Sequence, residues 1–99
     1  MITLKEPSEF EWDKGNIDKN EIKHRVQNKE SEETFFDSNK KIIKSRKLYF
    51  KDEERYILIG KTKKERLLYI VFTKREKKLR IISARDINKK EKYLYEKRT

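Results

Sequence analysis

Three apolar runs of strand length lie between residues 55 and 85, and they constrain the fold more than any other feature of the chain. The runs cover residues 56–60, 67–73 and 79–84 and are rich in β-branched and aromatic side chains. The charged connectors between them are too short for a crossover helix, so we expect neighbouring strands to pair antiparallel in a meander. The middle run is apolar throughout residues 67–72, which predicts a strand that is buried on both faces and covered by helices.

The N-terminal part of the chain contains the signals of two helices. We expect residues 1–9 to form an arm with a short strand at residues 2–4, followed by a second short strand at residues 10–12. An aspartate that can accept backbone N–H groups then begins a helix over about residues 13–25. A second helix is predicted over residues 29–36, where acidic side chains lie near its positive end.

The remaining segments flank the meander. Residues 37–53 are a basic connector with two short runs, 42–43 and 48–50, that suit an edge strand. After the third apolar run, Asn88 and Glu91 have the spacing of a capping box, which predicts a helix that ends near residue 97.

Length and composition limit this chain to one small domain. Ninety-nine residues bury a modest core, so we expect one α+β domain over residues 10–99, an antiparallel meander packed against two N-terminal helices with a short C-terminal helix. The sequence is 46% charged and 33% hydrophobic, which is close to the composition of disordered chains. Because the apolar residues are concentrated in the three runs, we interpret the chain as folded.

The net charge of +10 is unevenly distributed. Residues 1–37 carry 6 Lys and Arg against 10 Asp and Glu, a charge of −4, and residues 38–99 carry 22 against 8, a charge of +14. A basic body of this kind attracts polyanions, nucleic acid above all. The alternative is a solvated surface with no specific partner.

Several classes of site and location are not expected from this composition. There is no cysteine and only one histidine, so we expect neither a metal site nor a cofactor. The sequence has no apolar run of signal-peptide length at its start and none that approaches a membrane span. These features predict a soluble, cytoplasmic protein without a membrane partner.

The predicted first helix carries a polar stripe where a core helix would carry leucine. Ile17, Asn20, Glu21 and His24 fall on one side at helical spacing. Such a departure from apolar packing indicates either function or a satisfied polar network. The alternative for His24 is a histidine hydrogen-bonded within the domain.

Two arginines in the third apolar run are candidates for phosphate contacts. Regular alternation puts Arg80 and Ile82 on one face of the strand, and Ser83 and Arg85 on the other, unless the strand bends at its end. The planar, permanently charged guanidinium suits a phosphate group. The alternative is an ion pair within the domain, with Glu54, Asp86 or Glu91.

A series of short motifs extends along most of the chain. The motifs, in order, are Phe10-Glu11-Trp12-Asp13, Lys19-Asn20, Lys23-His24-Arg25-Val26, Glu32-Glu33-Thr34-Phe35-Phe36, Glu53-Glu54-Arg55-Tyr56 with Gly60, Arg66-Leu67-Leu68, Val71-Phe72-Thr73, and Arg80-Ile81-Ile82-Ser83-Ala84-Arg85 followed by Glu91 and Tyr95. In these motifs residues 10–95 resemble the BrnT family, the toxin component of a bacterial type II toxin–antitoxin pair. The chain departs from the family in its long acidic arm and in Glu65, at a hairpin position where the family often has glycine.

The resemblance implies a RelE-like fold and a metal-independent endoribonuclease in which the ribose 2′-hydroxyl attacks the adjacent phosphate. Such chemistry needs a base, cations that stabilise the phosphorane, and an acid. By resemblance, Arg80 and Arg85 contact the phosphate with support from Lys23, and His24 and Glu54 are the base and the acid in an order left open.

Two further residues are assigned by the same resemblance, and they complete the expected site. Arg55 and Tyr95 orient the catalytic groups and bind RNA, although Tyr95 is equally suited to the core of the last helix.

The resemblance also implies a partner. A BrnA-like antitoxin with a ribbon-helix-helix part would neutralise the toxin in a hetero-oligomer that binds operator DNA through the antitoxin. The alternative function is a non-catalytic basic module that binds RNA or DNA. Its sheet would stack bases on aromatic side chains, namely Tyr49, Tyr56, Tyr69 or Phe72.

Overall fold

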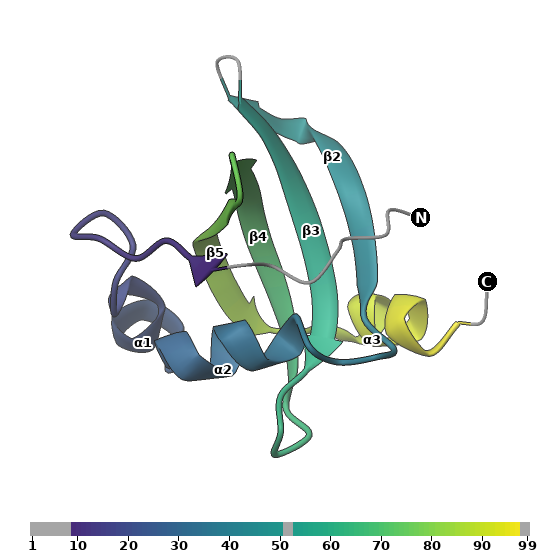
Figure 1. The fold of residues 1–99 in the computed structure, drawn as a ribbon. Helices are drawn as coiled ribbons and strands as arrows, with labels where there is room; N and C mark the ends of the chain where they lie inside the picture. Colours follow the sequence, from purple (N-terminus) through teal and green to yellow (C-terminus); the bar gives the residue numbers. More distant parts are fainter. Residues whose placement is uncertain (1–8, 51–52, 98–99) are drawn as a thin grey trace.

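The computed structural model describes residues 9–50 and 53–97, which form a five-stranded sheet and three helices (Figure 1). In chain order the elements are β1 (Glu9–Phe10), α1 (Lys19–His24), α2 (Asn28–Thr34), β2 (Lys41–Phe50), β3 (Glu53–Lys61), β4 (Leu67–Arg75), β5 (Lys78–Asp86) and α3 (Lys89–Glu96). The strand order is β1-β5-β4-β3-β2, with β1 parallel to β5 and every other pair antiparallel. The predicted α+β class and the meander of β3, β4 and β5 are confirmed.

One face of the sheet packs against α1 and α2, and we call it the helical face (Figure 1). Leu68, Ile70 and Phe72 of β4 are completely buried on it. Phe35, which follows α2, makes edge-to-face contacts with the rings of Phe10 and Phe72, with centroids 5.1 and 5.0 Å apart. Burial of these large side chains is the main source of stability in the core.

Helices cover the other face much less completely. β5 ends at Asp86 and α3 begins at Lys89, so the short connection leaves α3 near one end of the sheet, where it contacts β3. On this face of β4, Leu67 and Tyr69 are half-buried, whereas Val71 and Thr73, farther from α3, are buried. The prediction that helices cover both faces of the middle strand therefore holds for the helical face and only in part for the other.

The first helix begins later than predicted. Residues 14–18 are turns, and α1 begins only at Lys19. Two local hydrogen bonds compete with a helix here: the Asp13 carboxylate accepts the Gly15 N–H at 2.8 Å, and the Asn16 side chain accepts the Asp13 N–H at 2.8 Å. Asp18 also has a left-handed backbone, with φ of 56°. Asp and Asn side chains commonly replace helical bonds in this way.

The expected polar stripe is correspondingly divided. Asn20 faces the sheet and is buried, whereas Ile17, Glu21 and His24 are exposed.

The other predicted elements agree closely, with one correction. The second helix covers residues 28–34, and the capping box between Asn88 and Glu91 begins α3 as predicted. The segment interpreted as a connector with two short edge runs is instead one edge strand, β2, with an irregular register between Ser45 and Phe50. Pairing with β3 extends the strand beyond the first run through Lys44 and Ser45. The expected strand at residues 2–4 lies outside the described residues.

Candidate functional site

A β-bulge in β5 determines where the two candidate arginines point. Ser83 pairs with Val71 of β4, but the next pair is Ile81 with Phe72, so Ile82 is an extra residue. An extra residue reverses the alternation of side chains beyond it. The expectation that Arg80 and Arg85 lie on opposite faces is therefore wrong, and both arginines lie on the face away from α1 and α2.

We call this second side of the sheet the arginine face. Arg80 pairs with Thr73 and Arg85 pairs with Tyr69, and paired residues in an antiparallel sheet point to the same side. Arg55 of β3 also pairs with Thr73, so Arg55 and Arg80 lie on the two strands that flank β4. The Arg80 and Arg85 positions are four β4 residues apart, about 13 Å at the usual rise per residue.

Arg80 is paired with two carboxylates from the start of the chain. Its Nη1 lies 3.0 Å from Glu11 Oε1 and 2.7 Å from Asp13 Oδ2, and its Nη2 lies 2.9 Å from Asp13 Oδ1. Glu11 Oε1 also accepts a bond from Arg75 Nη1 at 3.2 Å, and Arg75 Nη2 lies 3.3 Å from Glu53 Oε2. We call these five residues the Arg80 cluster. The hydrogen bond from Arg80 lowers the pKa of Asp13, and the same bond raises the pKa of Arg80.

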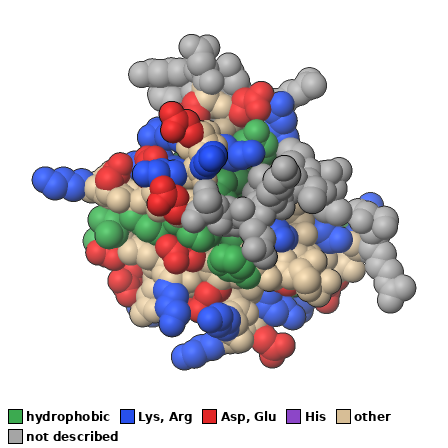
Figure 2. Space-filling view, viewed as in Figure 1, with side chains coloured by type: hydrophobic (Ala, Val, Ile, Leu, Met, Phe, Trp, Pro, Cys, Tyr) green, Lys and Arg blue, Asp and Glu red, His purple; other side chains and the backbone are tan. Residues whose placement is uncertain are grey.

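The uneven charge of the sequence is thus partly neutralised within the fold. Glu9 lies 3.3 Å from Lys78, and it precedes the two carboxylates that pair with Arg80. The acidic side chains of residues 9–13 therefore lie against basic residues of β4 and β5. On the helical face, acidic and basic side chains are interspersed in the same way (Figure 2).

A cavity of about 380 Å³ adjoins the Arg80 cluster, and we call it the edge cavity. Its lining consists of Glu53, Glu54, Tyr56, Lys74 and Arg75. Glu54 Oε1 lies 2.9 Å from Lys44 Nζ, and Glu54 Oε2 accepts a bond from the Tyr56 hydroxyl at 3.2 Å. The bond from Lys44 and that from Tyr56 lower the pKa of Glu54, so it is a carboxylate at neutral pH. Burial, followed by the nearby carboxylate, raises the pKa of Tyr56.

Arg85, at the other end of β5, is bound in a different way. Its Nη1 and Nη2 lie 2.9 and 2.8 Å from the two carboxylate oxygens of Glu91, and Nη1 also donates to the Asp86 carbonyl at 3.0 Å. Its guanidinium stacks on the ring of Tyr69, 4.1 Å from the centroid. The ion pair with Glu91 is one of the alternatives expected from the sequence.

Lys23 and His24 lie at the exposed end of α1, near the same end of β5 as Arg85. Arg66 joins these elements, because it donates to Asp86 Oδ1 at 2.7 Å, to the Arg25 carbonyl at 2.8 Å and to the His24 carbonyl at 3.4 Å.

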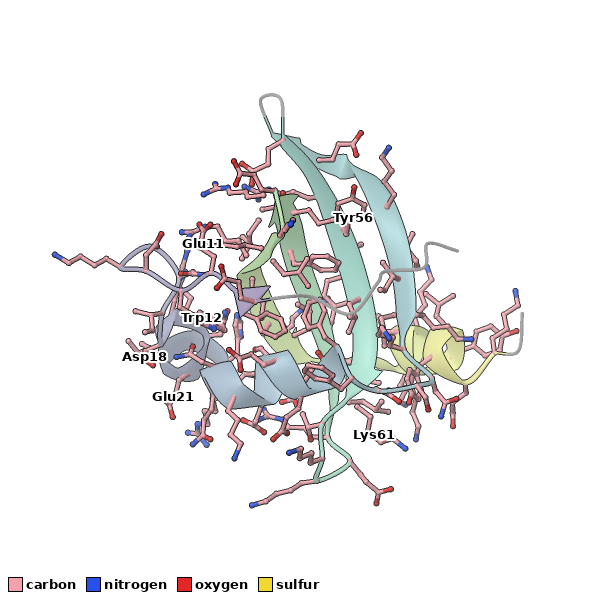
Figure 3. The ribbon with its side chains drawn as sticks, viewed as in Figure 1. Glu11, Trp12, Asp18, Glu21, Tyr56 and Lys61 are labelled. Atoms are coloured by element: carbon pink, nitrogen blue, oxygen red, sulfur yellow. The ribbon has the colours of Figure 1, made fainter. Side chains whose placement is uncertain are left out.

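The expected base and acid are not brought together. Gly60 and Asp86 both pair with Leu68, so the His24 end of the sheet lies six β3 residues from Glu54, about 20 Å away. In Figure 3, the labelled residues Tyr56 and Lys61 lie toward opposite ends of β3.

Tyr95 connects α3 to the loop after α2. Its hydroxyl donates to Asp37 Oδ2 at 2.7 Å, and burial together with this bond raises its pKa strongly. Its ring also lies 6.0 Å from Lys61 Nζ. These contacts favour the alternative that Tyr95 is a structural residue of the last helix.

The structure thus divides the expected residues between two ends of the sheet. Glu54, Arg55 and Arg80 lie at one end, and the rest lie toward the other, namely Lys23, His24, Arg85 and Tyr95. Sequence reasoning missed Glu11 and Asp13 as partners of Arg80, although both lie in a quoted motif. Their partner is more than sixty residues away, so no local spacing could reveal the contact.

Residues 9–50 and 53–97 contain no group of three or more His, Cys, Asp or Glu side chains that could hold a metal ion. No helix in this part of the chain is long and apolar enough to cross a membrane.

Comparison with known proteins agrees with the sequence motifs. Residues 12–91 match the model of a family described as the ribonuclease toxin, BrnT, of a type II toxin–antitoxin system. A search of curated proteins finds no match. The match extends over more than half of the chain, from the motif at Trp12 to the α3 residue Glu91 that binds Arg85. The chain therefore belongs to the BrnT family of ribonuclease toxins of type II toxin–antitoxin systems.

Proposed function

We propose that this chain is a metal-independent endoribonuclease with a RelE-like fold, and that the RNA 2′-hydroxyl attacks the adjacent phosphate at the Arg80 end of the sheet. One observation carries the choice of this end. Arg75 lines the edge cavity together with Glu54 and shares Glu11 with Arg80, so Arg75 connects the carboxylate in the cavity to the Arg80 cluster. The reaction needs these parts in one place.

In this proposal Glu54 is the general base. It is ionised at neutral pH, and a phosphate bound beside it would raise its pKa because the two negative charges repel. A base is most effective when its pKa lies near the working pH, so substrate binding strengthens Glu54. Tyr56, whose raised pKa keeps it protonated, lies 3.2 Å from Glu54 and would donate a proton to the leaving 5′-oxygen. His24 lies about 20 Å from Glu54 and has no part in this proton transfer.

The cations hold the phosphate. A phosphate that replaces Glu11 and Asp13 on Arg80 would receive the same paired N–H bonds that the carboxylates now accept. Arg55, on the flanking strand, would orient this group. We propose that the RNA continues along the arginine face to Arg85 and to Lys23 at the end of α1, where the contacts stabilise binding.

The partner follows from the family, since a type II toxin is paired with an antitoxin. We propose a BrnA-like antitoxin with a ribbon-helix-helix part, which binds operator DNA in the complex. An acidic segment of it would cover the basic residues of the chain. Association should be fast at low salt and slow at high salt, because charge attraction of this kind is screened. A salt-independent on-rate would argue against an electrostatic contact.

The test of the proposed reaction is RNA cleavage in EDTA. Wild-type protein should shorten RNA and leave 2′,3′-cyclic phosphate ends, and Glu54→Gln should lose at least about 10²-fold in rate, as expected for general base catalysis. Glu96→Gln is the matched control, because it removes the same charge from an exposed position on α3. If EDTA abolishes cleavage by the wild type, the reaction is not metal-independent.

A second candidate function is a non-catalytic RNA-binding module. One observation favours it. Carboxylates already bind Arg80 and Arg85, so neither guanidinium can stabilise a reacting phosphate until the phosphate displaces its carboxylate partner. The same assay separates the two functions. RNA that binds but stays intact, with no growth arrest on expression, would support the module.

A further inference from the structure

Among the described residues, the outer edge of β5 has a strand neighbour only at its start. β1 pairs with Lys78 and Leu79, and the Glu11 N–H then donates to the Leu79 carbonyl at 2.8 Å. Beyond this point two asparagine side chains take the place of a strand. The Asn16 amide donates to the Ile81 carbonyl at 3.0 Å, and Asn20 Oδ1 accepts the Ala84 N–H at 3.0 Å. An amide side chain carries the same donor and acceptor as a peptide group, so it can satisfy a strand edge.

These two bonds are compatible only with a bulged strand. In a regular strand, backbone groups of alternate residues point to the same edge, as those of Leu79 and Ile81 do here. By that rule the Ala84 N–H would point toward β4. It points to the outer edge instead, because Ile82 is an extra residue between the two asparagine contacts.

Both asparagines are buried polar residues at the edge of the sheet. Asn16 is 2% exposed and Asn20 is 4% exposed. Nδ2 of Asn20 has no hydrogen-bond partner in the described structure, so this residue leaves a buried donor unsatisfied while its oxygen binds Ala84. Asn16 also donates to the Glu11 carbonyl at 2.9 Å and accepts from the Asp13 N–H, so it fixes the segment that carries the partners of Arg80.

We infer that Asn16 and Asn20, the asparagine pair, are positioning residues: they select the bulge at Ile82 and thereby put Arg80 and Arg85 on one face of the sheet. The consequence for RNA cleavage rests on the proposed function. The consequence for the register of β5 is independent of the proposed function.

The first measurement is the register itself, read from cross-strand NMR contacts. In the wild type, Arg80 faces Thr73 and Arg85 faces Tyr69. In Asn16→Ala/Asn20→Ala one of these pairings should move by one residue. If the double variant does not fold, Asn20→Ala alone is measured, since it removes a single bond. Unchanged pairings in a folded variant overturn the inference, whether or not the protein cleaves RNA.

The second measurement is a double-mutant cycle on cleavage. Asn16→Ala should lower the rate at saturating RNA by about 10²-fold, as expected for a small misplacement of a catalytic group. In an Arg80→Ala background, Asn16→Ala should lower the cleavage rate by less than about threefold, because the side chain that Asn16 positions is already absent. Equal losses in both backgrounds would show a purely structural role and overturn the inference.

The matched control for both measurements is Asn28→Ala. Asn28 accepts the Asp18 N–H at 3.1 Å and donates to Asp18 Oδ1 at 2.9 Å, and these bonds join the same N-terminal segment without contacting β5. The control should leave both pairings and the cleavage rate unchanged within about twofold. If wild-type protein fails to cleave RNA, the proposed function fails, and the pairings still decide the role of the asparagine pair.

Discussion

At one end of β5, Arg80 binds Asp13, whose side chain is 54% exposed, and at the other end Arg85 binds Glu91, whose side chain is 12% exposed. Both arginines make paired bonds to a carboxylate on the same face of one strand. Glu91 also accepts the Asn88 N–H in the capping box of α3, so the pair with Arg85 is part of a helix boundary. A ligand phosphate can replace an exposed carboxylate more easily than a buried one that has a second structural role. Arg80 itself is 14% exposed and Arg85 is 35% exposed, so the difference lies in their partners. We therefore propose that Arg80 exchanges its carboxylates for the reacting phosphate, and that Arg85 mainly holds the fold.

The largest expected effect is the loss of activity in Arg80→Ala. Removing a cation that meets charge developing in the transition state should lower RNA cleavage by about 10²-fold. The thermal midpoint should change little, because the partners of Arg80 remain partly exposed. Lys64→Ala is the control, since it removes one positive charge from an exposed loop at the other end of the sheet.

Arg85→Ala should act on stability instead. It leaves Glu91 without its paired bonds, and we expect a loss of about 1–2 kcal/mol in the free energy of unfolding, reduced from the buried-pair value because Arg85 is partly exposed. For a domain of this size, this corresponds to a midpoint lower by roughly 5–15 °C. At temperatures below the thermal midpoint of Arg85→Ala, its rate of RNA cleavage should be lower than that of the wild type by less than about tenfold. An unchanged midpoint with a 10²-fold loss of cleavage would reverse the comparison.

Acid titration tests the same difference between the two ends. Burial raises the pKa of Glu91, but the bonds from Arg85 and from the Asn88 N–H outweigh it, so the pKa lies below its ordinary value of 4.5. A lowered pKa stabilises the fold at pH values above 4.5, and the contribution is lost as the pH falls through the lower, folded value. Stability should therefore be constant between pH 7 and about pH 5 and decrease below it. Glu91→Gln should flatten that decrease, measured by urea unfolding at each pH, and Asp13→Asn should do so much less.

Release of Arg80 should strengthen RNA binding. Glu11→Gln removes a charge that Arg75 and Arg80 share, and we expect an affinity for single-stranded RNA about two- to fivefold higher at low salt. Glu21→Gln removes an equal charge from the exposed side of α1 and is the control for net charge. Equal gains in the two variants would mean that total charge, and not access to Arg80, controls binding.

The parts of the fold that were predicted correctly depend on neighbours in sequence. The apolar runs of β3 to β5 have strand length, and Asn88 and Glu91 are three residues apart, so both signals are local. The bulge at Ile82 was not predictable, because Ile81 and Ile82 are equally apolar and either could face the core. Its cause is the contact with Asn16 and Asn20, more than sixty residues earlier.

The site was predictable to a similar extent. The motifs identified Arg80 and Glu54 as candidates, and the structure puts both at the end that contains the edge cavity. The pairing of Arg80 with Glu11 and Asp13, and the distance between Glu54 and His24, depend on the topology of the sheet. Residue spacing contains no information on either.

The smallest expected effect concerns the hairpins at the two ends. Glu65, between β3 and β4, and Glu76, between β4 and β5, have left-handed backbones with φ of 67° and 57°. A side chain in this region costs about 1–2 kcal/mol, and glycine avoids that cost but loses about 0.5–1 kcal/mol through its flexible unfolded state. Glu65→Gly and Glu76→Gly should therefore each stabilise the fold by about 0.5 kcal/mol, measured by urea unfolding. The two gains should be equal, because the ends differ in the burial of their ion pairs and not in backbone strain. A clearly larger gain at Glu76 would indicate that strain is concentrated beside the Arg80 cluster, where the proposed reaction takes place.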